Sequence, residues 1–164
     1  MESVAHFLQV QANSYPPSSR DFDLFGRSSF NRYYYAAYLR VRSILGNLNE
    51  AWTTTQHASI PDLLTGQVLT TIRRQRVRAA KLDDGPAVQI CRRAEASARE
   101  LADLMREAYA VRVTADYHPE IIVVADDRGR FRLNSMPVTV AHDWPTRASE
   151  HGQRIERAWS IADD

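Results

Sequence analysis

Residues 112–118 bring together side chains that can do acid–base and phosphate chemistry: Arg112, Asp116 and His118. A guanidinium is a permanent cation that can hold a phosphate through two parallel hydrogen bonds. An imidazole titrates near neutral pH, so it can take up or deliver a proton. Asp116 follows Arg112 by four residues, which places both on one helix face as an ion pair. The same spacing has a purely structural interpretation, in which Arg112 and Asp116 stabilise the helix and His118 caps its end.

These residues end a long helix, which the sequence predicts from about Pro86 to Ala115. Apolar residues recur along it at steps of three or four, as expected for the buried face of an amphipathic helix: Val88, Cys91, Ala94, Ala98, Leu101, Met105 and Ala108. The next step reaches Arg112. Because arginine is rarely buried unless it is paired, we expect Arg112 to have a partner on this face.

The remaining pattern predicts an all-α fold, a four- to five-helix bundle with a small β-hairpin inserted before the last helix. We expect residues 1–164 to form a single domain. The further helices are predicted at 2–14, at 28–45 with Ser28 or Ser29 as N-cap, and at 66–82. The second of these has its own buried stripe: Phe30, Tyr34, Ala37, Val41, Ile44, Leu45 and Leu48. A β-type run at 121–124 and a return strand at 130–133, joined by a turn at 126–129, predict the hairpin within 119–143. Trp144-Pro145 is expected to open the C-terminal helix, residues 144–162.

Composition excludes several classes of protein. The chain is 44% hydrophobic and 25% charged with a net charge of +1, which is typical of a globular protein that stays in solution. No segment approaches the roughly 20 apolar residues that a membrane span needs, and no signal peptide is visible. The single cysteine, Cys91, excludes an internal disulfide and fits a cytoplasmic location. We find no His, Asp and Glu cluster at metal-ligand spacing, so neither a metal nor another cofactor is expected.

A basic run in the third helix offers a possible contact for nucleic acid. Arg74, Arg78 and Lys81 share one helix face, and no acidic residue lies between positions 71 and 82. Because the net charge is small, any attraction for RNA must come from such a local patch. The run therefore predicts an RNA-binding stripe, with a solvated helix face as the alternative.

Two stretches resemble the HEPN domain family. The segment NRYYYAAYLRVRSIL, residues 31–45, resembles the tyrosine-rich helix of that family, and His57 falls where many members carry a histidine. The segment LMREAYAVRVTADYHPE, residues 104–120, resembles the closing helix with its Arg-x-x-Ala-Asp-Tyr signature. The resemblance extends over about residues 28–118 and is closest to prokaryotic members found beside minimal nucleotidyltransferases.

The resemblance implies a ribonuclease site. Many HEPN domains cut RNA without a metal, using an arginine followed after four to six residues by a histidine, at the interface of a homodimer. Arg112 and His118 fit this pattern, with VTADY between them. By the same resemblance, Asp116 or Tyr117 would orient the imidazole, and Arg32 and His57 would join the cleft. The leading expectation is a cytoplasmic endoribonuclease of the toxin or phage-defence kind. The tyrosines at 33, 34, 35 and 38 are expected to serve chiefly in packing.

Two other functions stay open. In the first, the chain is a non-catalytic partner that binds a nucleotidyltransferase antitoxin or another defence effector, and also a nucleotide or RNA. In the second, it is a structural dimer subunit of a larger defence complex. The enzyme hypothesis predicts that Arg112 and His118 face one cleft, with Arg32 or His57 near. The binding hypothesis predicts that His118 points away from such a cleft.

Overall fold

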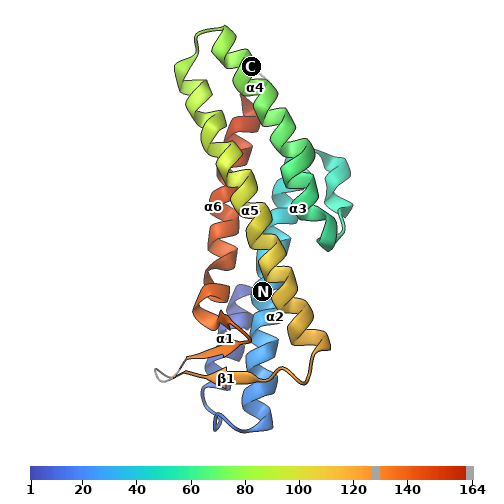
Figure 1. Ribbon diagram of the computed structural model, residues 1–164, viewed down its shortest axis with the longest axis vertical. Coiled ribbons are helices and arrows are strands. Elements are labelled where there is room, and N and C mark those ends of the chain that lie inside the picture. The colour runs from blue at the N-terminus through green and yellow to red at the C-terminus, as the bar shows by residue number, and fades with distance from the viewer. Residues whose placement is uncertain (127–129, 162–164) are drawn as a thin grey trace. The chain divides into compact units, whose positions relative to one another are not determined.

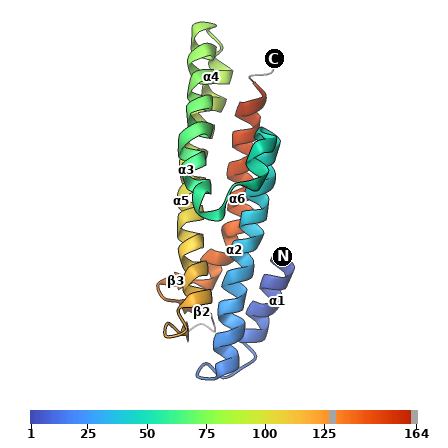
Figure 2. The same cartoon turned by 90° about the vertical axis from the view of Figure 1, so that its right-hand side faces the viewer.

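The computed structural model describes residues 1–126 and 130–161 and is predominantly helical (Figures 1 and 2). The helices are α1 (Glu2–Ala12), α2 (Arg20–Leu48), α3 (Ile60–Leu63), α4 (Leu69–Lys81), α5 (Gly85–Tyr117) and α6 (Val138–Ser160). Short helical turns connect some of them: η1 (Glu50–Thr54), η2 (His57–Ser59) and the π-helical turn η3 (Leu64–Val68). The strands are β1 (Val123–Ala125), β2 (Phe131–Leu133) and β3 (Met136–Pro137). The predicted fold class, an all-α fold with a small antiparallel element before the last helix, is confirmed.

The antiparallel element is a three-stranded sheet in the order β1-β2-β3, where the sequence predicted two strands. Val123 pairs with Leu133, and Leu133 pairs in turn with Met136 on the added strand. A tight turn at Asn134, whose φ is 54°, makes the second reversal possible, since asparagine tolerates the left-handed region. Part of the turn predicted at 126–129 lies outside the described residues.

The chain divides into two compact units, each of which is considered by itself. Unit 1 comprises Met1–Tyr38 and Glu107–Thr146, and unit 2 comprises Leu39–Arg106 and Arg147–Asp164. Helices α2, α5 and α6 contribute turns to both units. This division is not visible in the sequence, because the apolar stripes of the long helices continue across its boundaries.

The core of unit 1 forms where the sheet packs on α2 (Figure 1). Phe131 of β2 is fully buried and makes edge-to-face contacts with Phe22 and Phe30, at centroid distances of 5.7 and 5.9 Å. Val123 of β1 lies against Gly26, where a Cβ atom would come within 3.0 Å of the valine methyl. A glycine in α2 thus permits the close approach of the strand.

In unit 2, α4 and α5 run antiparallel and are joined by a short turn (Figure 1). Asp83 takes the left-handed conformation in this turn with a φ of 54°, and the Asp84 carboxylate accepts a hydrogen bond from Ala87 N at 2.9 Å. Asp84 is therefore the N-cap of α5. Large apolar side chains of the unit are fully buried, among them Leu45, Ile60, Leu64, Ile72, Leu101 and Met105.

The apolar stripes predicted for α2 and α5 are buried, apart from Val88, which is partly exposed. Helix α1 also forms as predicted, but its larger apolar side chains face outward. Val4 is 47% and Phe7 is 59% exposed, whereas the small residues Ala5 and Ala12 are buried. No helix of the described part of the chain has the length and apolar character needed to cross a membrane.

The predicted start of the second helix was wrong. Helix α2 begins at Arg20, and the Ser19 hydroxyl accepts a hydrogen bond from Phe22 N at 3.1 Å, as an N-cap does. Ser29 is instead buried inside the helix, where its hydroxyl donates to Gly26 O at 2.6 Å. The sequence predicts a cap at Ser28 or Ser29 because the apolar stripe becomes regular only after them.

The predicted starts of the helices at residues 66 and 144 were also wrong. Helical structure leading into α4 already begins at Ile60, where Pro61 occupies the first turn. Helix α6 begins at Val138, so Pro145 lies inside it. Proline lacks an N–H and normally interrupts a helix, which is why the pattern favoured a start at this point. Burial of Val138, Ala141 and Trp144 in unit 1 supports the additional turns.

Candidate functional site at the end of helix α5

The last turns of α5 place Arg112, Asp116 and Tyr117 in direct contact. Arg112 Nε lies 2.9 Å from Asp116 Oδ2, and the two side chains are only 17% and 26% exposed. The Arg112 guanidinium carbon lies 5.2 Å from the centroid of the Tyr117 ring, within range of a cation–π contact. The predicted pair of Arg112 and Asp116 on one helix face is thus present. Tyr117 contacts Arg112, whereas the resemblance implied that Asp116 or Tyr117 would orient the imidazole of His118.

Arg112 is held firmly in its charged form. Burial by itself lowers its pKa, but the hydrogen bond with Tyr117 and the carboxylate of Asp116 raise it overall. Tyr35 of α2 adds to the same effect, so the guanidinium lies near the tyrosine-rich face of α2. The Arg112 Nε atom is buried and is not aligned for a hydrogen bond, so its contact with Asp116 is an ion pair.

Asp116 also links α5 to α2. Its Oδ1 atom accepts a hydrogen bond from Asn31 Nδ2 at 2.6 Å. Both carboxylate oxygens therefore have a partner within the chain, one on its own helix and one on α2. Sequence reasoning missed Asn31, although it falls inside the tyrosine-rich segment.

His118 lies just beyond the end of α5 and has a different partner. Its Nδ1 atom is 2.9 Å from Glu120 Oε1, and the histidine and glutamate side chains are 47% and 66% exposed. Backbone and His118 hydrogen bonds lower the pKa of Glu120, which keeps it ionised. Because a carboxylate only accepts hydrogen bonds, Nδ1 must carry the proton. A neutral imidazole then presents the lone pair of Nε2 as a base.

Arg27 binds backbone carbonyl groups at His118 and on either side of it. Its guanidinium donates to Ala115 O at 3.0 Å, to His118 O at 3.4 Å and to Ile121 O at 2.7 Å. It also pairs with Asp23 at 3.0 Å, and Asp23 in turn accepts from Val123 N at 2.7 Å. Arg27 thus satisfies the Ala115 carbonyl in the last turn of α5, where carbonyl groups lack helical partners, and binds the backbone that follows the helix.

One part of this arrangement is visible in the sequence. Asp23, Arg27 and Asn31 recur at steps of four, so they share one face of α2. Their partners are backbone carbonyls and a carboxylate distant in the sequence, which side-chain spacing does not identify.

A polar pocket of about 280 Å³ lies between α2 and the end of α5 in unit 1. Arg32, predicted as a supporting residue, lines it together with Arg27, Ser28, Asn31 and Asp116. Arg112 and His118 are not among the residues lining this pocket. Arg32 and Asp116 are therefore brought together, while the imidazole of His118 is turned to Glu120.

The other predicted site residues belong to unit 2. His57 is partly exposed in η2, and Arg74, Arg78 and Lys81 are exposed along α4. Cys91 is fully buried, and burial together with Glu95 raises the pKa of its thiol, so packing is its role. Among the described residues, no group of three or more His, Cys, Asp or Glu is placed to hold a metal ion.

The tyrosines of α2 pack as predicted. Tyr33, Tyr34 and Tyr38 are buried, and burial raises the pKa of Tyr33 to about 12. The Tyr33 hydroxyl lies 2.6 Å from Gln9 Oε1 and 2.9 Å from His142 Nδ1, so it joins α1, α2 and α6 within unit 1.

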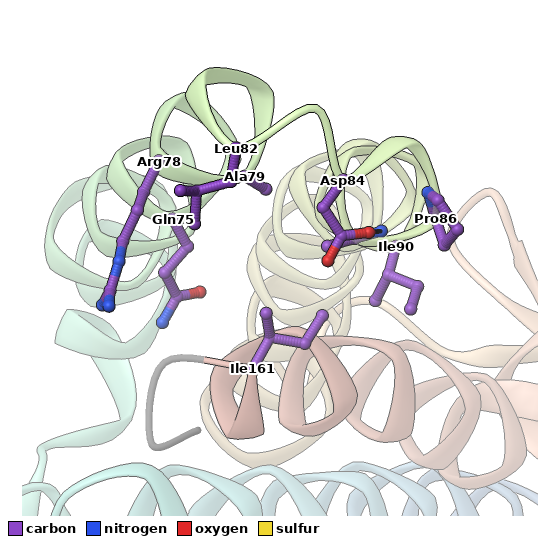
Figure 3. A pocket seen from close by; sticks show the side chains of 9 residues that line it. Gln75, Arg78, Ala79, Leu82, Asp84, Pro86, Ile90 and Ile161 are labelled. Atoms are coloured by element: carbon purple, nitrogen blue, oxygen red, sulfur yellow. Dashed lines mark hydrogen bonds between the residues drawn. The ribbon is translucent and has the colours of Figure 1, made fainter.

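A second, more apolar pocket of about 400 Å³ lies in unit 2, beside the turn that joins α4 and α5 (Figure 3). Leu82, Ile90 and Ile161 line it, and its polar members are Gln75, Arg78 and Asp84. The Gln75 Oε1 atom is buried and has no hydrogen-bond partner among the described residues. The pocket thus offers one unused acceptor but contains none of the predicted catalytic residues.

Comparison of the chain with protein-family models, with curated proteins and with solved structures gives no match. The geometry at the end of α5 and the motif resemblance are therefore the observations that bear on function.

Proposed function

We propose that the chain is a metal-independent endoribonuclease of the HEPN toxin or phage-defence type, and that it acts as a homodimer. The single observation that carries the proposal is the pairing of His118 Nδ1 with Glu120 at 2.9 Å, which orients the imidazole and fixes its tautomer. In acid–base catalysis, the imidazole that acts as the base often donates a hydrogen bond from its other ring nitrogen to a carboxylate. Arg112 supplies a permanent cation six residues before it on the same chain.

The proposed reaction is an internal transesterification of RNA. Nε2 of His118 takes the proton of a ribose 2′-hydroxyl, and the 2′-oxygen attacks the adjacent phosphorus. The bond from phosphorus to the 5′-oxygen breaks, and that oxygen takes a proton from the imidazolium of a second copy of the chain. The products are a 2′,3′-cyclic phosphate and a 5′-hydroxyl. Arg112 stabilises the charge that develops on the phosphate oxygens.

The test is cleavage of a labelled RNA by the purified protein in EDTA, beside the same oligonucleotide carrying 2′-O-methyl groups. We expect cleavage of the first and none of the second, with 2′,3′-cyclic phosphate ends. Removing a general base typically costs 10²- to 10⁴-fold, so His118→Ala should lose about that much activity. Glu120→Gln should lose less, since an amide oxygen can still accept from Nδ1.

Glu107→Gln is the matched control for Glu120→Gln, because it neutralises an exposed carboxylate on α5, the helix that ends just before His118. It should cleave like the wild type. Unchanged cleavage by His118→Ala would exclude the proposed base. Loss of activity on adding EDTA would exclude the metal-independent mechanism.

The state of Arg112 favours a second candidate, a non-catalytic subunit that binds a nucleotidyltransferase antitoxin or another defence protein. Its side chain is only 17% exposed and is paired with Asp116 and Tyr117 within the chain. An arginine committed in this way supports the structure more readily than it holds a substrate phosphate. This candidate predicts no cleavage at any protein concentration, and a stable complex when the chain is co-expressed with the products of adjacent genes.

A further inference from the structure

Three arginines surround one buried carboxylate in unit 2. Glu95 of α5 is 7% exposed, and Arg76 Nε donates to its Oε1 at 2.5 Å. Arg73 Nε and Arg99 Nη2 lie 3.8 and 3.7 Å from its other oxygen, Oε2. Arg73 and Arg76 come from α4, whereas Arg99 lies one turn beyond Glu95 on α5. We call these four residues the Glu95 cluster.

The cluster has more positive charge than its carboxylate can neutralise. Three guanidinium groups face one carboxylate, so two positive charges remain. The arginine side chains are 34 to 51% exposed, while that of Glu95 is 10% exposed. The buried carboxylate thus holds the three guanidinium groups close together, while the arginine side chains stay partly exposed to solvent.

We propose that the Glu95 cluster binds the phosphodiester backbone of RNA. Arg73 and Arg99 approach the same carboxylate oxygen, so their guanidinium groups are close enough to contact one phosphate from two helices. Arginine suits this task because its planar fork matches the oxygens of a phosphate. The inference rests on the proposed function only in naming RNA as the polyanion, since the cluster itself performs no chemistry.

The surrounding charges favour a linear polyanion as the partner. Helix α4 carries no acidic residue along Leu69–Lys81 but carries five cationic ones: Arg73, Arg74, Arg76, Arg78 and Lys81. At about 1.5 Å per residue, these charges extend over roughly 12 Å of helix. A nucleic-acid strand presents a regular row of phosphates over such a distance. The Glu95 cluster would be the part of this row where the cations are held in place.

The test measures binding of a fluorescent, fully 2′-O-methylated RNA by anisotropy at about 50 to 200 mM salt. This RNA cannot be cleaved by the proposed reaction, so failure of binding and failure of catalysis are read separately. Arg73→Ala/Arg99→Ala removes two exposed arginines and leaves the Arg76–Glu95 pair intact. We expect affinity to fall about tenfold or more, and the slope of log K against log salt to fall by about 0.7, because the two arginines share one phosphate of a single strand.

Arg92→Ala/Arg93→Ala is the matched control. It removes the same charge from exposed positions of α5 that no contact joins to Glu95 in the described part of the chain. This control should lose clearly less affinity than the cluster variant. Circular dichroism of both variants checks that they fold alike.

Three results would overturn the inference. Equal losses in the two variants would mean that overall charge, and not the cluster, governs binding. An unchanged affinity in the cluster variant would remove it from the RNA site. If polyglutamate displaced the labelled RNA at the same concentration as unlabelled RNA does, the surface would be assigned to an acidic protein instead.

Discussion

Asp116 lies 2.9 Å from Arg112 Nε across one turn of α5, and both side chains are largely buried. An ion pair of similar length on the same helix, Arg106 with Asp103 at 2.8 Å, is 48% and 76% exposed. Solvent screens the exposed pair, whereas screening is weaker for the buried one. We expect a coupling free energy of about 1 kcal/mol between Arg112 and Asp116, and of less than about 0.5 kcal/mol between Arg106 and Asp103.

Two double-mutant cycles measured by urea unfolding check this expectation, each with alanine for arginine and asparagine for aspartate. A large coupling would identify the Arg112–Asp116 pair as a structural element whatever its role with RNA. Equal coupling energies in the two cycles would contradict the argument from burial.

Arg27 should be among the costliest surface-accessible arginines to replace. In Arg27→Lys the planar fork is lost, so most of the bonds to the carbonyl groups of Ala115, His118 and Ile121 cannot form. Hydrogen bonds to charged groups are worth about 1.5–3 kcal/mol each, and we expect a loss of about 2–4 kcal/mol in the free energy of unfolding. Urea denaturation measures it.

Arg130→Lys is the control for this change. Arg130 also pairs with an aspartate four residues earlier, Asp126, but the two side chains are 44% and 40% exposed. The expected loss is below about 0.5 kcal/mol, in line with exposed pairs. A loss in Arg27→Lys as small as in this control would show that the carbonyl contacts add little stability.

The contrast between Arg112 and Arg27 shows which contacts of the site can be predicted from the sequence and which cannot. Arg112 and Asp116 are neighbours on one helix, so their pairing follows from a spacing of four residues. Arg27 contacts carbonyl groups nearly a hundred residues away in sequence, and every residue type has such a group. The spacing of Asp23, Arg27 and Asn31 places them on one helix face, but it does not identify these carbonyl partners.

Helix boundaries show the same limit. The buried stripes of α2 and α5 were predicted correctly, because apolar residues recur at the helical period. The first turns of α2 and α6 were missed, since contacts in unit 1 bury Phe22 and Trp144 and stabilise turns that lack a regular stripe. Tertiary packing overrides local propensity at these positions.

Gly152 and Gly66 should respond in opposite ways to replacement by alanine. A Cβ atom at Gly152 of α6 would clash with Ile44 Cδ1 and lie 2.9 Å from Ile44 Cγ1, whereas nothing lies within 4 Å of one at Gly66. Overpacking typically costs about 1–3 kcal/mol. We therefore expect Gly152→Ala to destabilise by about 1–2 kcal/mol, and Gly66→Ala to be neutral or stabilising by up to about 1 kcal/mol.

The clash itself is tested with Ile44→Val, which removes the Cδ1 atom. Ile44→Val alone should cost about 0.5–1.5 kcal/mol. In the double variant Gly152→Ala/Ile44→Val the two losses should be far from additive, because the shorter side chain leaves room for the new methyl group. Additive losses in thermal or urea unfolding would mean that Gly152 is needed for another reason.

Stability should fall as the pH is lowered from about 7 to 5, in part because of His151. This imidazole is buried in unit 2, with Ser97 Oγ and Glu100 Oε2 each 3.4 Å from Nδ1. Burial lowers its pKa, and Arg154 and Arg147 lower it further, while Glu100 and Glu150 oppose the shift. The unfolded chain, with an ordinary histidine pKa near 6.5, therefore binds a proton at a higher pH than the folded chain does.

The sign of the effect follows from this difference. Above pH 6.5 neither state binds the proton, so the contribution of His151 to stability is fully present. As the pH falls below 6.5 the unfolded state gains the proton first, and stability is lost with a slope of at most about 1.4 kcal/mol per pH unit. His151→Asn, which keeps a polar group near the position of Nδ1, should show a shallower loss between pH 7 and 5. Urea unfolding of the two proteins at a series of pH values makes the comparison, and identical slopes would exclude His151 as the group responsible.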